Sequence, residues 1–366
     1  MEDKSVHIQF MQRALQLAAR GEKAVRPNPM VGAVIVKNGD IIAEGFHERF
    51  GYNHAELNAL IIAGTEAKGS TLYVNLEPCC HQGKTPPCTD AIIKAGVSTV
   101  VIGMSDPNPK VAGKGIEILK RHGISVITDV ETDACCGLNH VFIKYISLGL
   151  PYVTMKIAQS LDGRIATESG HSKWITGTAA RAQVHQIRCD NDAVLVGIGT
   201  VLADNPRLTI RHLAGKQPRR IVLDSQLQTP LNSNLLTDAH ASQTIIATTR
   251  PNSIALSKIQ KMGITIWRME ADDFGGVALA PLLHRLAEER ISTLLVEGGA
   301  SIFTSFLRER LVDRLVIMMA PKIIGRGTDA IGSLHIEKVD KSYQLKHVNV
   351  RKLCEDIVVE GDVVYP

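Results

Sequence analysis

The pattern of apolar and polar positions over the first 150 residues alternates between a strand period and a helix period. Apolar runs at 29–36 and 41–46 flank Asn38-Gly39, a dipeptide typical of a tight hairpin turn. Further strands are expected at 71–76, 99–104 and 124–130, and helices at 6–19, 55–63, 89–95, 114–122 and 132–148. This alternation predicts an open sheet that is flanked by helices.

The periodicity breaks at Leu148-Gly149-Leu150-Pro151, and a new strand begins at Tyr152. We therefore expect two domains, 1–149 and 150–366. In the second, apolar strands lead into glycine turns at Gly197 and at Gly298-Gly299, and the latter precedes a helix expected at 302–310. Such turns can present backbone N–H groups to a phosphate, although plain turn glycines explain the pattern equally well.

The composition is that of a globular chain long enough for two cores, with 366 residues, 45% hydrophobic and 21% charged. A net charge of only +4, 4% aromatic residues and the absence of a Lys/Arg block argue against nucleic-acid binding. Seven cysteines, an odd number, favour a reducing compartment over disulfides. The polar start Met1-Glu2-Asp3-Lys4 and the lack of a membrane-length apolar run predict a soluble, cytoplasmic protein without membrane contact.

The strongest chemical signal lies in His54-Ala55-Glu56 and the cysteine-rich segment 78–88. One imidazole and two thiolates suit a catalytic zinc, which keeps a fourth position open for water. Glu56 would then exchange protons with that water rather than bind the metal, as in zinc deaminases of amino-pyrimidines and amino-purines. Cys79 and Cys88 adjoin an expected helix N-terminus, which favours thiolates. The alternative is that these cysteines are buried, inert small side chains.

The spacing of these cysteines departs from the usual deaminase pattern Pro-Cys-x-x-Cys, because eight residues separate Cys79 from Cys88. Segment 77–88 resembles the deaminase half of the bifunctional riboflavin-biosynthesis deaminase/reductases, whose pattern is Glu-Pro-Cys-x-His-x-Gly-x-Thr-Pro-Pro-Cys. The resemblance implies one zinc per chain on His54, Cys79 and Cys88, with Glu56 as the catalytic acid and base. It leaves Cys80 and His81 as bystanders or as neighbours that orient the ligands.

The second half resembles the reductase half of the same family. The similarity is carried by segment 156–166, by segment 197–209 with its Ala-Asp-Asn-Pro-x-Leu-Thr ending, and by Val296-Glu297-Gly298-Gly299. The resemblance implies a cytidine-deaminase-like three-layer α/β/α domain followed by a dihydrofolate-reductase-like α/β domain. Both resemblances together span nearly the whole chain.

The same resemblance implies residue roles in the reductase half. Contacts with NADPH are implied for Ala158, Trp174, Thr200, Asp204, Ser225, Gly299, Ala300, Ser301, Ile302, Phe303, Thr304 and Ser305. Substrate contacts are implied for Ser172, Arg188, Leu208, Arg211 and Glu297. Lys156 and Glu297 are charges on otherwise apolar strands, so either they act on the substrate or they form a buried structural ion pair. Arg188 and Arg211 would clamp a sugar phosphate, whereas a solvated surface arginine is the plain alternative.

The implied function is a pair of reactions on a pyrimidine ribosyl phosphate. Zinc-dependent deamination comes first, and NADPH-dependent reduction of the ribosyl to a ribityl group follows. The family also implies a homo-oligomer. Two rivals predict otherwise: a nucleoside or nucleic-acid deaminase with an accessory domain, or a zinc-stabilised binding module whose closed site recruits Cys80 or His81. Cys135, Cys136, Cys189 and Cys354 are expected to be ordinary core or surface residues.

Overall fold

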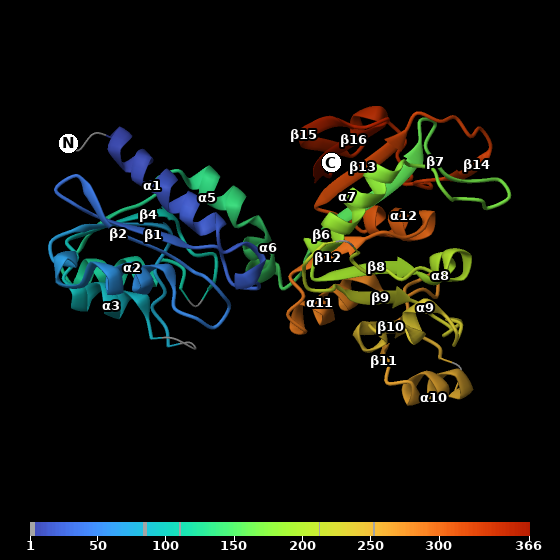
Figure 1. Ribbon diagram of the computed structural model, residues 1–366, viewed down its shortest axis with the longest axis horizontal. Coiled ribbons are helices and arrows are strands. Elements are labelled where there is room, and N and C mark those ends of the chain that lie inside the picture. The colour runs from blue at the N-terminus through green and yellow to red at the C-terminus, as the bar shows by residue number, and fades with distance from the viewer. Residues whose placement is uncertain (1–3, 83–85, 110, 212, 252) are drawn as a thin grey trace. The chain divides into compact units, whose positions relative to one another are not determined.

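The computed structural model describes residues 4–82, 86–109, 111–211, 213–251 and 253–366 (Figure 1). Gly83, Lys84 and Thr85 of the cysteine-rich motif lie outside these residues. The chain divides into two compact units, Met1–Gly149 and Leu150–Pro366. The break in periodicity described above falls at this division. No helix in the described part of the chain is long and apolar enough to cross a membrane.

The first unit is built on a five-stranded sheet in the order β2-β1-β3-β4-β5. Its strands are β1 (Gly32–Lys37), β2 (Asp40–Phe46), β3 (Thr71–Leu76), β4 (Thr99–Met104) and β5 (Ser125–Ile127). The β1–β2 hairpin and the β1–β3 pair are antiparallel, whereas β3, β4 and β5 run parallel. Parallel strands place the loops after β3 and β4 at the same edge of the sheet, where the cysteine-rich segment begins.

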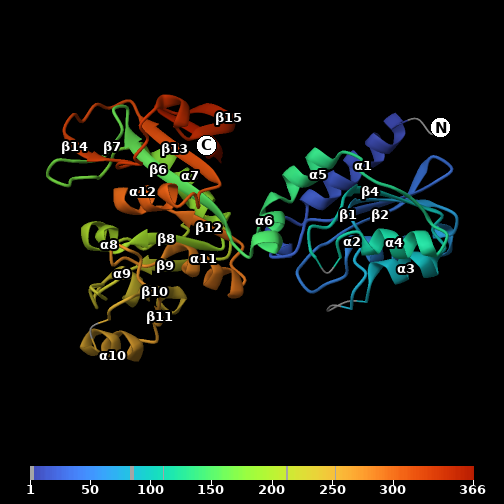
Figure 2. The same ribbon diagram turned by 180° about the vertical axis from the view of Figure 1, so that it is seen from behind.

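Helices cover both faces of this sheet and give it three layers (Figures 1 and 2). One face carries α1 (Lys4–Ala19) and α5 (Thr132–Leu138), and the other carries α2 (Ala55–Ala63), α3 (Cys88–Ala95) and α4 (Lys114–Arg121). Apolar side chains from both layers pack on the strands, among them Met11, Ala59 and Ile92, which are fully buried. The helix pattern in the sequence thus reflects burial against the sheet on one side of each helix.

Two elements of this unit differ from the sequence prediction. The helix expected at 132–148 is two helices, α5 and α6 (His140–Leu148), and the strand expected at 124–130 is only β5. Asp129 and Glu131 adopt positive φ, which ends the extended run. Asn139 interrupts the helix because its side chain bonds a distant backbone: Oδ1 accepts from Met30 N at 2.8 Å and Nδ2 donates to Met30 O at 3.0 Å.

Replacing Asn139 with alanine is expected to lower the free energy of unfolding by about 1–3 kcal/mol, because the buried Asn139 amide is lost and the half-buried backbone of Met30 loses both of its partners. Denaturant unfolding of the first unit measures this loss. Gln12→Ala, which removes an exposed amide from α1, is the control and should leave the unfolding curve unchanged. Equal stability of the Asn139 variant would show that the two hydrogen bonds do not hold the helix break in place.

The second unit contains a nine-stranded sheet in the order β11-β10-β9-β8-β12-β6-β13-β16-β15. Its strands are β6 (Tyr152–Ser160), β8 (Ala193–Gly197), β9 (Arg219–Leu223), β10 (Thr244–Thr248), β11 (Thr265–Arg268), β12 (Thr293–Val296), β13 (Arg314–Ala320), β15 (Gln344–Leu353) and β16 (Asp356–Val364). Along the sheet from β11 through β10, β9, β8, β12 and β6 to β13, neighbouring strands are parallel. The hairpin of β16 and β15 is antiparallel and forms the edge beside β13.

Helices lie on both faces of the larger sheet as well. Leu282, Leu286 and Phe306 from α11 (Leu279–Glu288) and α12 (Ala300–Arg308) pack on one face. The other face carries the helices α7 (Thr178–Cys189), α8 (Ile198–Asp204), α9 (Asn234–Thr237) and α10 (Ser253–Lys261). Both units are therefore α/β, as the sequence predicts.

The structure differs from the prediction at the two expected glycine turns. Helix α8 begins directly after β8, so Gly199 and Thr200 lie in a helix rather than in a turn. Helix α12 begins at Ala300, two residues before the predicted start, and Gly299 precedes it with φ +71°. A positive φ at this junction explains the glycine there.

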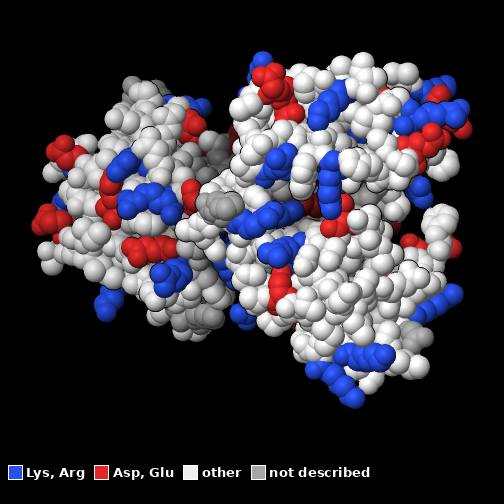
Figure 3. Space-filling model, turned by 45° about the vertical axis from the view of Figure 1, so that its right-hand side comes forward, with Lys and Arg blue, Asp and Glu red and all other residues white. Residues whose placement is uncertain are grey.

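A two-stranded ribbon of β7 (Arg164–Thr167) and β14 (Gly327–Asp329) accompanies the larger sheet. Arg164 forms an ion pair with Asp329 across the ribbon. On the face shown in Figure 3, basic and acidic side chains lie near one another over much of the surface, whereas basic side chains predominate at its lower right.

Candidate active sites

Three predicted metal ligands converge at the edge of the smaller sheet. His54 precedes the first residue of α2, Cys79 follows β3, and Cys88 is the first residue of α3. His54 Nδ1 lies 3.5 Å from Cys79 Sγ and 3.3 Å from Cys88 Sγ, and the three donor atoms all lie within 4.8 Å of one another. One imidazole nitrogen and two sulfurs at this separation fit a zinc ion.

The surroundings of Cys79 favour the thiolate form that zinc requires, whereas contact with Cys79 and burial raise the pKa of Cys88. Contact with the Cys88 side chain and the imidazole of His54 lowers the pKa of Cys79 to about 4. The backbone N–H of Cys88 also donates to Cys79 Sγ at 3.3 Å. The start of α3 thus stabilises negative charge on a sulfur that belongs to the preceding loop.

Neither Cys80 nor His81 belongs to this converging set among the described residues. The nearby residue Glu77 has a structural role. Its buried carboxylate accepts hydrogen bonds from the backbone N–H groups of Asp106, Gly113, Gly115 and Ile116. Glu77 therefore fixes the loop that precedes α4 against the end of β3. A closed four-ligand site, as the binding-module alternative requires, is not formed by the described side chains.

Glu56 lies in the first turn of α2, two residues after His54, and is 3% exposed. Its Oε2 atom has no hydrogen-bond partner among the described residues. Burial raises the pKa of this carboxyl. A buried carboxyl with a raised pKa beside a metal site is suited to taking up a proton and passing it on.

Glu56, His54 and Cys79 line a cavity of about 310 Å³ inside the first unit. Its walls combine aromatic side chains such as Phe50 and Phe142 with a few polar groups. The volume lies at the lower end of the range for small-molecule sites. A single flat ring with polar substituents suits these walls.

The cavity also contains four polar residues that were not predicted from the sequence: Asn28, His47, Asp106 and Asn108. His47 is 2% exposed, and burial lowers its pKa, so the ring is neutral. Its Nδ1 bonds Asn53 O at 2.9 Å, and its Nε2 then accepts from Asn28 Nδ2 at 3.2 Å. Burial also raises the pKa of Asp106 to about 6. The only signal in the sequence is their position at strand ends or in proline-flanked loops.

The predicted reductase residues Lys156 and Glu297 meet in the second unit, joined by Arg188. Arg188 Nε and Nη2 donate to the two oxygens of Glu297 at 2.6 and 2.8 Å, and Lys156 Nζ lies 3.8 Å from Glu297 Oε2. The exposed fractions of the side chains are 11% for Lys156, 6% for Glu297 and 13% for Arg188. Burial alone would raise the pKa of Glu297, but Arg188 and Lys156 lower it overall.

These contacts modify the predicted arginine clamp. Arg188 is not a solvated surface residue, since its guanidinium is paired with Glu297 and also donates to Thr209 O at 3.1 Å. Arg211 is exposed. Burial lowers the pKa of His185, and the charges of both arginines lower it further, so both act near the same imidazole. Arg211 is therefore the more available of the two for a phosphate.

The residues predicted to contact the cofactor come from several elements of the second unit. Ser172 Oγ donates to Asp204 Oδ1 at 3.4 Å, and an ideal Cβ on Gly299 would lie 3.5 Å from Thr200 Oγ1. Ala158, Ser225, Ala300, Ile302 and Ser305 are half-buried, whereas Ser301 and Trp174 are exposed. Arg181 lies over the ring of Trp174 at 4.7 Å.

Phe303 and Thr304 differ from the rest of that set. Phe303 is 3% exposed and packs in the core, and Thr304 Oγ1 donates to Ala300 O while accepting from Gly332 N. Their side chains are thus committed to the interior of the unit. They support α12 instead of facing solvent at its N-terminus.

Both halves of the chain match known families. Residues 4–104 match the cytidine and deoxycytidylate deaminase zinc-binding region, and residues 151–359 match the RibD C-terminal domain. The riboflavin biosynthesis protein RibD of Actinobacillus pleuropneumoniae is 44% identical over 361 residues, which cover 98% of this chain and 96% of that protein. The protein of the same description from Escherichia coli is 39% identical over 367 residues, covering 95% and 97%.

Solved structures agree with this similarity along the full length. Acinetobacter baumannii RibD aligns with a TM-score of 0.87 at 38% identity, covering 99% of this chain and 100% of that one. A diaminohydroxyphosphoribosylaminopyrimidine deaminase/5-amino-6-(5-phosphoribosylamino)uracil reductase from Thermotoga maritima aligns with a TM-score of 0.82 at 38% identity, covering 99% of both chains.

Proposed function

The chain belongs to the RibD family of bifunctional riboflavin-biosynthesis enzymes, and from this we propose that it deaminates a diaminopyrimidinone ribosyl phosphate and then reduces the ribosyl group with NADPH. The observation that carries the proposal is the convergence of His54, Cys79 and Cys88 beside a buried acid, in a chain whose second half matches a reductase domain. The alternative of a nucleoside or nucleic-acid deaminase is not favoured, because it leaves that second match unexplained.

We assign the deamination to the cavity in the first unit. Zinc held by His54, Cys79 and Cys88 would supply the acidified water that hydrolysis needs. Glu56 would take up the proton released by that water and return protons to the departing amino group. The cavity walls hold the pyrimidine ring, and neutral His47 presents its ring to the same cavity.

We assign the reduction to the second unit. A bound nicotinamide cofactor would supply the hydride for C1′ of the sugar, and the protein contributes binding and orientation. In the proposed site Asp204, Thr200 and Gly299 would hold the cofactor. Lys156, Arg188 and Glu297 hold the reacting part of the sugar, and Arg211 meets its phosphate. The choice of NADPH over NADH and the assembly of chains into a homo-oligomer are also part of the proposal, and both rest on family membership.

Removal of the metal should separate the two activities. With a strong chelator present, ammonia release from the diaminopyrimidinone phosphate is expected to stop, because hydrolysis requires the zinc. NADPH oxidation with the deaminated intermediate as substrate should continue at its original rate, since no predicted metal ligand lies in the second unit. Ammonia and NADPH are measured separately, and added zinc serves as the control that restores the first signal. Loss of both signals on chelation would contradict the assignment of deamination to the first unit and reduction to the second.

A further inference from the structure

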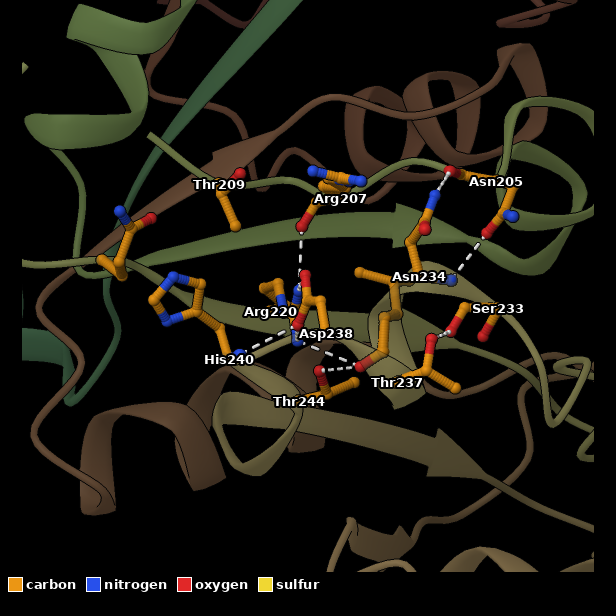
Figure 4. A network of polar contacts seen from close by, with 12 residues as sticks. Asn205, Arg207, Thr209, Arg220, Ser233, Asn234, Thr237, Asp238, His240 and Thr244 are labelled. Atoms are coloured by element: carbon orange, nitrogen blue, oxygen red, sulfur yellow. Dashed lines mark hydrogen bonds and ion pairs between the residues drawn. The ribbon is translucent and has the colours of Figure 1, made fainter. Parts of the chain in front are cut away.

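A buried ion pair holds the loop that links the two ends of the proposed reductase site. Arg220 on β9 is 1% exposed, and its Nη1 and Nη2 donate to Asp238 Oδ2 and Oδ1 at 2.7 and 3.0 Å. The same two nitrogens donate to the backbone oxygens of Arg207 at 2.9 Å and Leu235 at 3.0 Å. Figure 4 shows this guanidinium between Asp238 and the Arg207 backbone. One side chain thus joins β9, the end of α9 and the loop after α8.

The loop in question, 205–209, has a second attachment to the same region. The backbone N–H of Asn234 donates to Asn205 Oδ1 at 2.8 Å, and Asn234 Nδ2 donates to Asn205 O at 2.6 Å (Figure 4). Asn205 and Leu208 adopt positive φ, at +44° and +54°. Non-glycine residues hold such a conformation when surrounding contacts determine it. The path of the loop is therefore set from the α9 side.

Each end of this loop reaches the proposed site. At its start, Asp204 contacts Ser172 Oγ and lies 3.3 Å from Lys173 Nζ. At its end, Thr209 O accepts from Arg188 Nη1, the guanidinium that pairs with Glu297. A displacement at Arg207 would move the carbonyl of Thr209, two residues on, and with it the orientation of Arg188.

We propose that Arg220, with Asp238, is a positioning residue of the reductase: it fixes the 205–209 loop and so sets Asp204 at one end and the Thr209–Arg188–Glu297 chain at the other. This inference rests on the function proposed above. Burying the Arg220 guanidinium against the half-buried carboxylate of Asp238 contributes little net stability, because apolar side chains of similar volume often stabilise a fold as well. The guanidinium instead fixes the relative positions of its partners, since its planar fork bonds a carboxylate and two carbonyl oxygens at once.

The test uses the full-length chain and a double substitution, Arg220→Met with Asp238→Asn, which removes the buried charges together and keeps an acceptor for His240 N. We expect the KM for the deaminated intermediate to rise about tenfold to hundredfold, with a smaller change in kcat, because misplacing binding groups by about an ångström has effects of this size. Arg220→Lys keeps the charge without the fork and should give an intermediate KM. The deaminase activity of each variant should equal that of the wild type, which reports that the first unit has folded, and a kcat for reduction close to that of the wild type reports that the second unit has folded.

The matched control is Arg219→Met. Arg219 is the adjacent residue of β9, so its side chain points to the opposite face, where its Nη1 lies 3.2 Å from Glu289 Oε2. Its reductase KM should not change. The inference is overturned if the double variant reduces the intermediate with the wild-type KM, as the control does.

Hydrogen exchange of the backbone at 205–210 separates this inference from the proposed function. Faster exchange in the double variant than in Arg219→Met supports the positioning role, and equal exchange refutes it, whether or not the wild-type chain oxidises NADPH. A wild-type chain that releases ammonia but does not oxidise NADPH would contradict the proposed reductase instead.

Discussion

Replacing Glu56 with alanine is expected to reduce ammonia release by about a thousandfold, within the range that general acid–base groups contribute. The carboxyl is buried, borders the cavity and lies two residues from a metal ligand, and its Oε2 is without a hydrogen-bond partner in the described part of the chain. It is therefore placed to exchange protons and is not consumed by a structural contact. Glu56→Gln, which keeps the shape, should lose nearly as much activity.

Metal content and reduction distinguish this result from general damage. The zinc content of the Glu56 variants, measured by elemental analysis, should match the wild type, because Glu56 is not in the set of converging ligands. NADPH oxidation with the deaminated intermediate should be unchanged. Glu66→Gln, an exposed carboxylate of the same unit that pairs with Lys37, is the control. Retained deamination in the Glu56 variants would end the assignment of Glu56 as acid and base.

Replacing Lys156 with methionine is expected to reduce NADPH oxidation by about a hundredfold or more, the loss seen when a positioned donor is removed from a reacting site. Methionine preserves the buried stem, and Glu297 keeps its two bonds to Arg188, so no carboxylate is left unpaired. Ammonia release should not change. The measurement is the rate of NADPH oxidation at saturating deaminated intermediate.

Lys346→Met is the control for Lys156, because it removes an exposed lysine from the edge strand β15 of the same sheet. It should leave both activities unchanged. If Lys156→Met instead lowers ammonia release and NADPH oxidation equally, then the substitution has damaged folding and the chemical role of Lys156 is wrong.

The convergence of His54, Cys79 and Cys88 could be predicted from the sequence because their positions depend on local structure. His54 precedes a helix and Cys88 begins one, while Cys79 follows a strand, and each of these junctions has its own short-range signal. Parallel strands then bring the junctions to one edge of the sheet. Family resemblance was needed only to choose Cys79 and Cys88 over Cys80.

The remaining features depend on contacts between residues far apart in the chain. The bidentate pair of Arg188 and Glu297 joins a helix to the end of a strand. A single charged residue in a helix pattern does not indicate that it is buried or which residue it pairs with. In the same way, the break at Asn139 depends on a bond to Met30, which no helix propensity encodes. The predicted helix boundary thus failed at Asn139, whose side chain bonds backbone outside its own element, whereas the strand expected at 124–130 ended early at the positive φ of Asp129 and Glu131.

The short separation of the two sulfur atoms beside His54 also determines how the protein must be handled. With the thiolate favoured at Cys79 and Cys88 adjacent, dissolved oxygen can take two electrons from the pair and join the sulfurs covalently; Cys88 releases one proton, water supplies a second, and the oxygen leaves as hydrogen peroxide. If the zinc is removed and the protein is left in air, its mass should therefore fall by two hydrogen atoms. The protein should then not bind added zinc until a reductant is supplied. Purification under thiol protection, with zinc present from the first step, follows directly from that geometry.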